Sequence, residues 1–327
     1  TNTTGANNVS MGQGSSGANT TGGNNTAVGR SAGAALTTGN FNILIGTEAG
    51  DSLTTQNFNT AIGATAMGEA TTTQSVAVGQ ESLQKSTGAN NVGIGHQAGR
   101  YQSSGTQNVH IGAFSGTGVD GSSTASYNTA LGAYTLTANT TGAGGVAIGS
   151  GALASNTTGS YNIALGLNAL DENTTGAQNT ALGLSCLGSN TSGSFNNALG
   201  VGALATNTTA SNNTAMGHSA LNLNTTGYGN TAVGYGSLDA NTTGYYNVGL
   251  GQSALTDNTT GADNVAIGVS ALGTNSTASN NVAVGRSALA ANTTGAGNVA
   301  IGTQALLSNT TPNYNVAVGY QALYDQT

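Results

Sequence analysis

The feature that most constrains this chain is a five-residue core, Asn-x-Ala-x-Gly, that recurs along its whole length. The first residue of each core, called position n, lies at Asn8, Asn25, Asn42, Asn59, Ser75, Asn91, Asn108, Asn128, Gly145, Asn162, Asn179, Asn196, Asn213, Asn230, Asn247, Asn264, Asn281, Asn298 and Asn315. From Asn128 to Asn315 the core recurs at every seventeenth position, whereas the earlier steps range from sixteen to twenty. A short fixed period is typical of a repeat protein, in which each unit packs only on its neighbours.

Large apolar and small residues alternate within the core. Position n+3 is always Val, Ile, Leu or Met, position n+1 is Val or Ile in twelve copies, and position n+2 is Ala in fourteen. This period of two predicts a strand with n+1 and n+3 on one face and Ala on the other. Position n+4 is Gly in all nineteen copies, which predicts a corner with positive φ or a close backbone approach.

The rest of each repeat predicts a second short strand and a closing turn. From Asn128 onward position n+8 is always Leu, and a small residue precedes it, as in Ala254 and Leu255. We expect a second strand over n+6 to n+8. The linker is mostly Asn-Thr-Thr-Gly, as at 173–176, and these residues favour turns. Asn residues stacked from coil to coil are expected to form amide ladders.

Composition favours one fold class. Gly makes up 53 of 327 residues and charged residues only 5%, and the Gly, Asn and Thr content argues against helices. We therefore predict an all-β protein, a repetitive parallel β-roll or β-solenoid with about nineteen ~17-residue coils. Residues 1–127 are expected to form less regular coils and residues 128–327 regular ones, in one continuous solenoid.

The scarcity of large apolar residues in each coil indicates assembly. A thin roll buries little surface against its chain entropy. We expect the Val and Ile side of the strand to fill the interior. The Ala side is then expected to contact other chains around an axis, which gives a homotrimer. A monomeric roll with a polar Thr and Asn exterior is the competing hypothesis.

The core segments resemble those of a known family. Segments 264–268 and 298–302 both read Asn-Val-Ala-Ile-Gly, and they resemble the head repeats of trimeric autotransporter adhesins. The longer unit, with Asn-Thr-Ala-Val-Gly at 230–234, Leu238 and Asn-Thr-Thr-Gly at 241–244, is similar to repeats of tail-fibre-like proteins. The resemblance covers essentially the whole chain. It implies parallel β-rolls wound by three chains, although the coil of this chain is longer than the adhesin unit.

Charge and hydropathy exclude several classes of function. The net charge is −7 with only four basic residues, Arg30, Lys85, Arg100 and Arg286, so nucleic-acid binding is not expected. No apolar run approaches the roughly 18 residues that a transmembrane helix needs, so no membrane insertion is expected in this segment. The Gly-rich segments lack the Lys-Ser/Thr that follows a phosphate loop, and we expect no cofactor.

The few reactive side chains predict neither a metal site nor a nucleophile. His96, His110 and His218 are expected to be surface or interface residues, and a metal site between symmetry-related copies of one histidine is the alternative. Cys186 has no histidine in its own or neighbouring coils and is expected to be a small buried residue.

Three further sets of side chains are of types that can form sites. The carboxylates are expected to be solvated and not a glycosidase pair; they include Glu48, Asp51, Asp171, Glu172, Asp257 and Asp263. The Asn-x-Ser/Thr sequons are expected to be coil corners, with glycosylation as the alternative; they begin at Asn139, Asn156, Asn173, Asn190, Asn207, Asn224, Asn241, Asn258, Asn275, Asn292 and Asn309. The tyrosines near the turns are too irregularly spaced for a carbohydrate-binding stripe; they are Tyr161, Tyr228, Tyr235, Tyr245, Tyr246, Tyr314, Tyr320 and Tyr324.

These features predict a structural protein. The first hypothesis is the shaft of an extracellular trimeric fibre, a phage tail fibre or a bacterial surface adhesin, whose glycan or protein receptor binds a tip outside this segment. The second is an ice-binding solenoid that uses ordered Thr pairs such as Thr140–Thr141 and Thr157–Thr158. An enzyme, such as a fibre-borne glycan depolymerase, is the least favoured hypothesis, and no catalytic residue is predicted.

Overall fold

The computed structural model describes residues 2–325, which contain nineteen three-residue strands and no helix. The chain forms two compact units, Thr1–Asn162 and Ile163–Thr327. The N-terminal unit contains β1 (Val9–Met11), β2 (Thr26–Val28), β3 (Ile43–Ile45), β4 (Thr60–Ile62), β5 (Val76–Val78), β6 (Val92–Ile94), β7 (Val109–Ile111), β8 (Thr129–Leu131) and β9 (Val146–Ile148). The C-terminal unit contains β10 (Ile163–Leu165), β11 (Thr180–Leu182), β12 (Asn197–Leu199), β13 (Thr214–Met216), β14 (Thr231–Val233), β15 (Val248–Leu250), β16 (Val265–Ile267), β17 (Val282–Val284), β18 (Val299–Ile301) and β19 (Val316–Val318).

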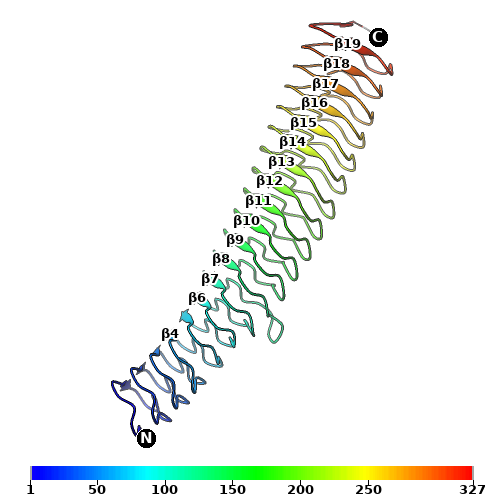
Figure 1. Cartoon of the computed structure of the whole chain (residues 1–327). Helices are drawn as coiled ribbons and strands as arrows, with labels where there is room; N and C mark the ends of the chain where they lie inside the picture. The colour runs from blue at the N-terminus through cyan, green and yellow to red at the C-terminus, as the bar shows by residue number, and fades with distance from the viewer. Residues whose placement is uncertain (1, 326–327) are drawn as a thin grey trace. The chain divides into compact units, whose positions relative to one another are not determined.

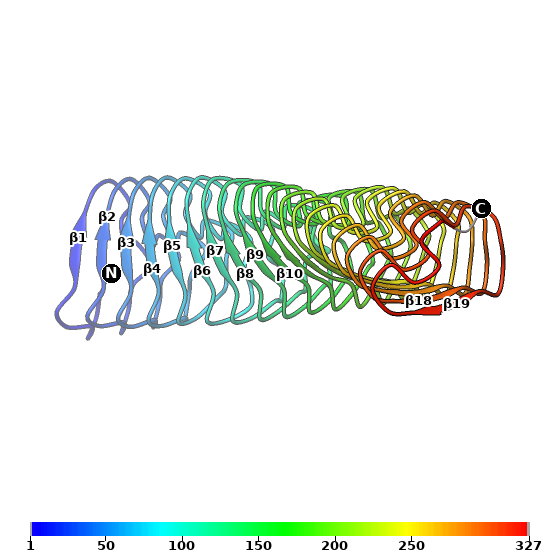
Figure 2. The ribbon, with the colours of Figure 1, turned by 90° about the horizontal axis from the view of Figure 1, so that it is seen from above.

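Within each unit, successive strands pair in parallel and in register, so equivalent residues of neighbouring coils lie side by side (Figures 1 and 2). In β13 and β14, for example, Thr214 pairs with Thr231 and Ala215 with Ala232. Each coil contributes one strand, and its paired equivalents in the regular coils are seventeen positions apart. This arrangement is a β-solenoid, which confirms the predicted all-β class.

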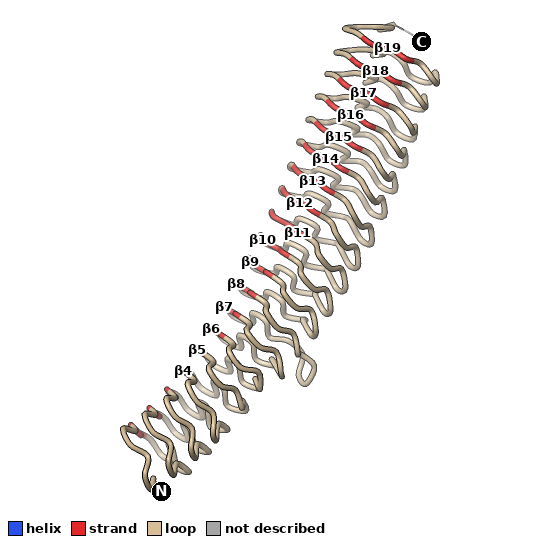
Figure 3. The backbone as a smooth tube through the Cα atoms, in the orientation of Figure 1, coloured by secondary structure: helices blue, strands red, loops and turns tan. Residues whose placement is uncertain are grey.

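Each coil has one strand, not two (Figure 3). The segment n+6 to n+8, expected to be a second strand, is instead a tight turn with positive φ at both ends, 55° at Ser253 and 53° at Leu255. Ala254 and Leu255 are both fully buried. Consecutive residues of a strand would point to opposite faces. The left-handed backbone at Leu255 is what turns both side chains inward, so the prediction of a second strand was wrong.

The strand faces are the reverse of those expected. In β16, Ala266 is fully buried whereas Ile267 is 39% exposed. The small n+2 residue therefore points into the coil and the large n+1 and n+3 residues point outward. The interior is filled by Ala at n+2, a small residue at n+7 and, in the regular coils, Leu at n+8, and it has no room for a further Val or Ile.

Two buried asparagine ladders hold the regular coils together. At position n, the amide of Asn247 donates to Asn230 Oδ1 at 3.2 Å and to Gly261 O at 2.8 Å. At position n+11, the amide of Asn258 donates to Asn241 Oδ1 at 2.8 Å and to the same Gly261 O at 3.0 Å. Each ladder bond joins neighbouring coils, and the shared glycine carbonyl braces the two sides of one coil. The predicted amide ladders are confirmed.

The invariant glycine at n+4 has both properties that its position predicted. Gly251 has a φ of +133°, and a Cβ there would lie 2.7 Å from the carbonyl group of Gly268 in the next coil. Any other residue would hold the coils apart at this corner.

Two N-terminal coils carry a large residue inside, at n+2. His110 is 3% exposed, which corrects its assignment to the surface or an interface. It fits because position n+8 is Gly116 in its own coil and Gly99 in the preceding coil, where other coils carry a large residue. A Cβ on Gly99 would lie 3.1 Å from the His110 ring, and one on Gly116 would collide with it. Leu44 is accommodated in the same way by Gly33 and Gly50.

The irregular stretch Ala113 to Tyr127 contains a loop that projects from the N-terminal unit between β7 and β8 (Figure 1). At its base the Ser123 hydroxyl donates to Asn139 O at 2.9 Å and accepts a bond from Val119 N–H at 2.7 Å. Near its tip, Asp120 forms an ion pair of 2.8 Å with Lys85. The extra residues are thus accommodated outside the coil, and the stacking continues around them.

Candidate functional site: the outer face of the strands

The outward side chains of the strands, at positions n+1 and n+3, form a mostly apolar surface on each unit that we call the outer face. Position n+3 is apolar in every coil, and the polar exceptions, six Thr and Asn197, all lie at n+1. None of these residues is charged in any of the nineteen coils. In the C-terminal unit the exposed fractions at n+3 include 43% for Leu165, 44% for Leu199 and 43% for Met216. Monomeric proteins rarely expose long contiguous apolar patches, so a surface of this kind is a candidate interaction site.

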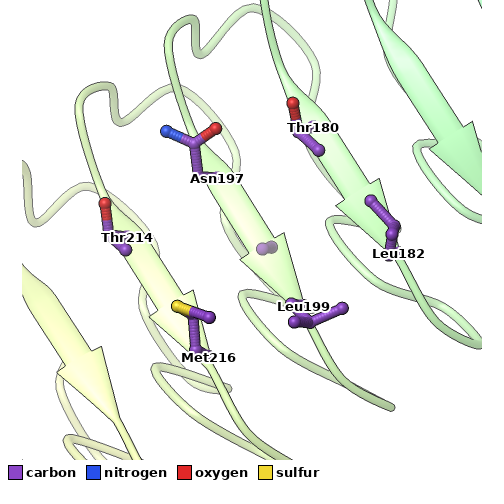
Figure 4. A pocket seen from close by; sticks show the side chains of 7 residues that line it. Thr180, Leu182, Asn197, Leu199, Thr214 and Met216 are labelled. Atoms are coloured by element: carbon purple, nitrogen blue, oxygen red, sulfur yellow. The ribbon is translucent and has the colours of Figure 1, made fainter.

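The outer face is widest near the start of the C-terminal unit. There position n+5 is also apolar and exposed, in Leu167, Leu184 and Val201. A shallow groove crosses the neighbouring strands β11 to β13 (Figure 4). Its lining includes Thr180, Leu182, Asn197, Leu199, Thr214 and Met216.

The geometry of the outer face favours a partner with the same repeat. Equivalent side chains recur at the spacing of neighbouring strands, about 4.8 Å. Without charges the face has no electrostatic means of selecting a partner. Shape therefore decides what fits, and a surface with the same period matches at every coil. A second copy of this chain has that property.

Comparison with models of protein families finds none that matches this chain, and comparison with curated protein sequences finds no match either. The function therefore has to be inferred from the fold and the outer face.

The two exposed histidines lie at n+5, beside the outer face, and contact aromatic rings. His96 packs edge-on against Phe114 with ring centroids 4.9 Å apart. His218 stacks on Tyr235 at 5.4 Å, and its Nδ1 lies 3.0 Å from the Ser219 hydroxyl. Among residues 2–325 no three His, Cys, Asp or Glu side chains come together as a metal site would require.

Cys186 is fully buried at n+7, as the sequence predicted. Burial raises the pKa of its thiol to about 12, so the thiol stays protonated and unreactive at neutral pH. The side chain acts as a small apolar residue in the coil interior.

The carboxylates lie mostly at the surface. Asp257 and Asp263 are exposed, as expected. Asp171 and Asp51 are half-buried, and desolvation raises the pKa of both, helped by Glu172 at Asp171 and by Glu48 at Asp51.

The sequon asparagines are structural. The eleven side chains from Asn139 to Asn309 form the n+11 ladder and are all buried. The amide of Asn241, for example, donates to Asn224 Oδ1 at 2.8 Å and to Gly244 O at 3.0 Å. A glycan would have to be attached to that same amide nitrogen, so the coil-corner prediction is supported.

The threonine pairs are not equivalent. The first hydroxyl is used inside the stack: Thr242 Oγ1 donates to Thr259 O of the next coil at 3.0 Å. The second threonine, as at Thr141 and Thr158, is exposed. Of the Thr pairs that the ice-binding hypothesis invoked, only the second residue of each such pair is exposed, as at Thr141 and Thr158.

The described part of the chain, residues 2–325, has no helix that could cross a membrane. Sequence reasoning identified both rows of the outer face but placed them in the interior. The signal that could have shown these rows to face outward is the lack of space in a short coil that already buries a Leu and two Asn side chains.

Proposed function

We propose that this chain is the shaft of an extracellular fibre, a phage tail fibre or a bacterial surface fibre, in which three copies pack through their outer faces. The observation that carries the proposal is the row of apolar side chains at position n+3 of the outer face, which no coil of either unit interrupts. Leu165, Leu199 and Met216 in this row are 43% to 44% exposed. Packing of three such rows around an axis would remove this surface from water. The resemblance to trimeric adhesin and tail-fibre repeats supports the same stoichiometry.

The architecture suits a mechanical role. Within each unit, successive coils are joined by backbone bonds at many points of the coil, for example Thr231 N to Asn247 O at 2.8 Å and Leu238 N to Ala254 O at 3.0 Å. The same contacts between neighbouring coils recur along each unit, and together they make the unit stiff. The receptor-binding tip, a glycan- or protein-binding element outside this segment, remains part of the proposal.

The outer face replaces the alanine face as the contact between chains. Ala266 and its equivalents are fully buried inside their own coils and cannot reach a partner. Ice binding is the less favoured function, because only one Thr row is exposed; thermal hysteresis of the purified chain would measure it directly.

The test is the mass in solution. Light scattering should give three times the 31.6 kDa chain mass. A variant with Leu165, Leu199 and Met216 each changed to Glu should be monomeric, because a trimer would bury nine like charges. The matched control is Thr158, Thr209 and Thr226 changed to Glu, exposed positions away from the outer face that should leave the trimer intact. A monomeric wild-type chain, or equal behaviour of both variants, would refute the proposal.

A further inference from the structure

The C-terminal unit carries a compact cluster of three tyrosines on two neighbouring coils. Tyr228 and Tyr245 occupy equivalent positions and stack with ring centroids 5.3 Å apart and planes 5° from parallel. Tyr246 packs edge-on against both, at 5.1 Å and 5.6 Å. All three are accessible, with exposed fractions of 42% for Tyr228, 38% for Tyr245 and 56% for Tyr246.

The residues around the cluster leave the rings uncovered. In the coils on either side, the position of Tyr228 and Tyr245 is occupied by the small residues Ser211 and Ala262. The outward ring faces of the stacked pair therefore have no large equivalent neighbour. Tyr246 lies against Gly229, where a Cβ would be 2.7 Å from its ring, so the lack of a side chain at Gly229 makes room for it.

The cluster is held by the backbone of the stack. The Tyr246 N–H donates to Tyr228 O at 3.1 Å, and the Asp263 N–H donates to Tyr245 O at 3.1 Å. These bonds hold the backbone that carries the three rings and Asp263, and the rings pack on one another without a ligand. Such pre-organisation lowers the entropy cost of binding.

We propose that Tyr228, Tyr245, Tyr246 and Asp263 form a binding site for a neutral pyranose ring of a glycan. The C–H face of a pyranose stacks on an exposed aromatic ring, and the tyrosine hydroxyls and the Asp263 carboxylate bind the sugar hydroxyls. Partial burial, and then the neighbouring Tyr246 and Tyr245, raise the pKa of Tyr228, so its hydroxyl remains a donor at neutral pH.

Charge determines which sugars fit. Asp263 is exposed and lies close enough to Tyr228 to help raise the pKa of its hydroxyl, and the only Lys or Arg of the C-terminal unit, Arg286, lies in a later coil. A sialylated or uronic-acid glycan would place its carboxylate near Asp263 with no cation to compensate. The site therefore selects neutral over acidic pyranosides, and it adds a lateral glycan contact to any binding at the tip. It does not depend on the trimer.

Saturation-transfer NMR on the whole chain tests the site, with lactose, cellobiose and diacetylchitobiose as neutral probes and sialyllactose as the acidic one. At least one neutral sugar should bind. Its affinity should fall about tenfold or more in Tyr246→Asn and in the double variant Tyr228→Ser, Tyr245→Ala. These substitutions place residues already present at the equivalent positions Asn212, Ser211 and Ala262, so the coils should fold.

The matched control is Tyr161→Ala, a tyrosine that lies against Gly144 in the same way but without two further rings. It should bind the neutral sugar as the wild type does. Absence of binding by all neutral probes, stronger binding of sialyllactose than of lactose, or unchanged affinity in the cluster variants would each overturn the proposal. The mass in solution, measured on the same samples, reports separately on the trimer.

Discussion

The coils that begin at Asn42 and Asn108 and the regular coils from Asn128 onward fill the same interior in different ways. A regular coil places Ala at n+2 and Leu at n+8, as in Ala130 and Leu136. The coil at Asn108 places His110 at n+2 and Gly116 at n+8. A large residue at n+2 is thus paired with Gly, and not Leu, at n+8 of the same coil, so the two positions do not both carry a large side chain.

The coils at Asn25 and Asn42 also differ from the regular coils in the polarity of position n+11. The regular coils carry the buried Asn ladder there, whereas Leu36 and Leu53 occupy the position in the coils at Asn25 and Asn42, and both are fully buried. In those coils the Leu has moved from n+8 to n+11. One ladder at position n is retained throughout this pair, since Asn42 donates to Asn25 Oδ1 at 3.1 Å. The first ladder is therefore the more general element of the fold and the second is replaceable by apolar packing.

The largest effect is expected when the Leu that regular coils carry at n+8 is placed in the coil that contains His110. Gly116→Leu should destabilise the N-terminal unit by more than about 3 kcal/mol, because the new side chain would overlap the His110 ring. The backbone itself suits Leu, since φ is +55° at Gly116 and +48° at Leu136. Chemical denaturation measures the loss.

The double variant His110→Ala, Gly116→Leu is the control for that change. It copies the pair Ala130 and Leu136 of the next coil and should recover most of the lost stability in a double-mutant cycle. Equal instability of the single and double variants would show that volume exchange is not what couples the two positions.

The second-largest effect is expected from acid, which should lower the stability of the coil that contains His110. His110 is neutral when folded because burial lowers its pKa to about 4, and its ring nitrogens have no hydrogen-bond partner within residues 2–325. The unfolded chain, with an ordinary histidine pKa near 6.5, takes up a proton first. Stability at this coil is therefore full above pH 6.5 and falls by about 3 kcal/mol as the pH drops to 4.

The regular coils should respond with the opposite sign. Desolvation raises the pKa of Asp171 and Asp239, so the folded state of these carboxyls binds a proton more readily than the unfolded state, and acidification removes a cost. Amide hydrogen exchange at pH 7 and at pH 4.5 should show faster local opening around β7 in acid. His110→Ala should abolish that acid sensitivity; if it persisted, its source would lie elsewhere.

A smaller effect is expected when the Leu that the coils at Asn25 and Asn42 carry at n+11 is placed in a regular coil. Asn241→Leu removes the amide bonds to Asn224 and Gly244 and leaves the amide of Asn258 without its acceptor at n+11. The expected loss is about 2 kcal/mol. Thr243→Ala, an exposed neighbour, should have little effect. Adding Leu238→Gly reproduces the Gly33 and Leu36 pair and should cost less than the sum of the two single changes; full additivity would argue against the exchange.

The sequence by itself determined the period, the strand, the corner and the ladders. These follow from local chemistry: alternation at n+1 to n+3 fixes a strand, Gly at n+4 allows positive φ, and a repeated Asn meets its equivalent once coils stack. The buried cysteine and the structural role of the sequon asparagines were predictable for the same reason, since each follows from its place in the repeat.

Only the tertiary structure decided which side of the strand is the inside. Alternation separates Ala from Val and Ile but does not say which set is buried, and the larger set is the natural guess on hydrophobicity alone. The choice is made by the width of the coil: with Leu272 turned inward by its left-handed backbone and two buried Asn side chains in the same coil, a small residue such as Ala266 fits at n+2. The burial of His110 was likewise decided by the fold. The two glycines that make room for its ring belong to two coils, which become neighbours only when the chain is folded.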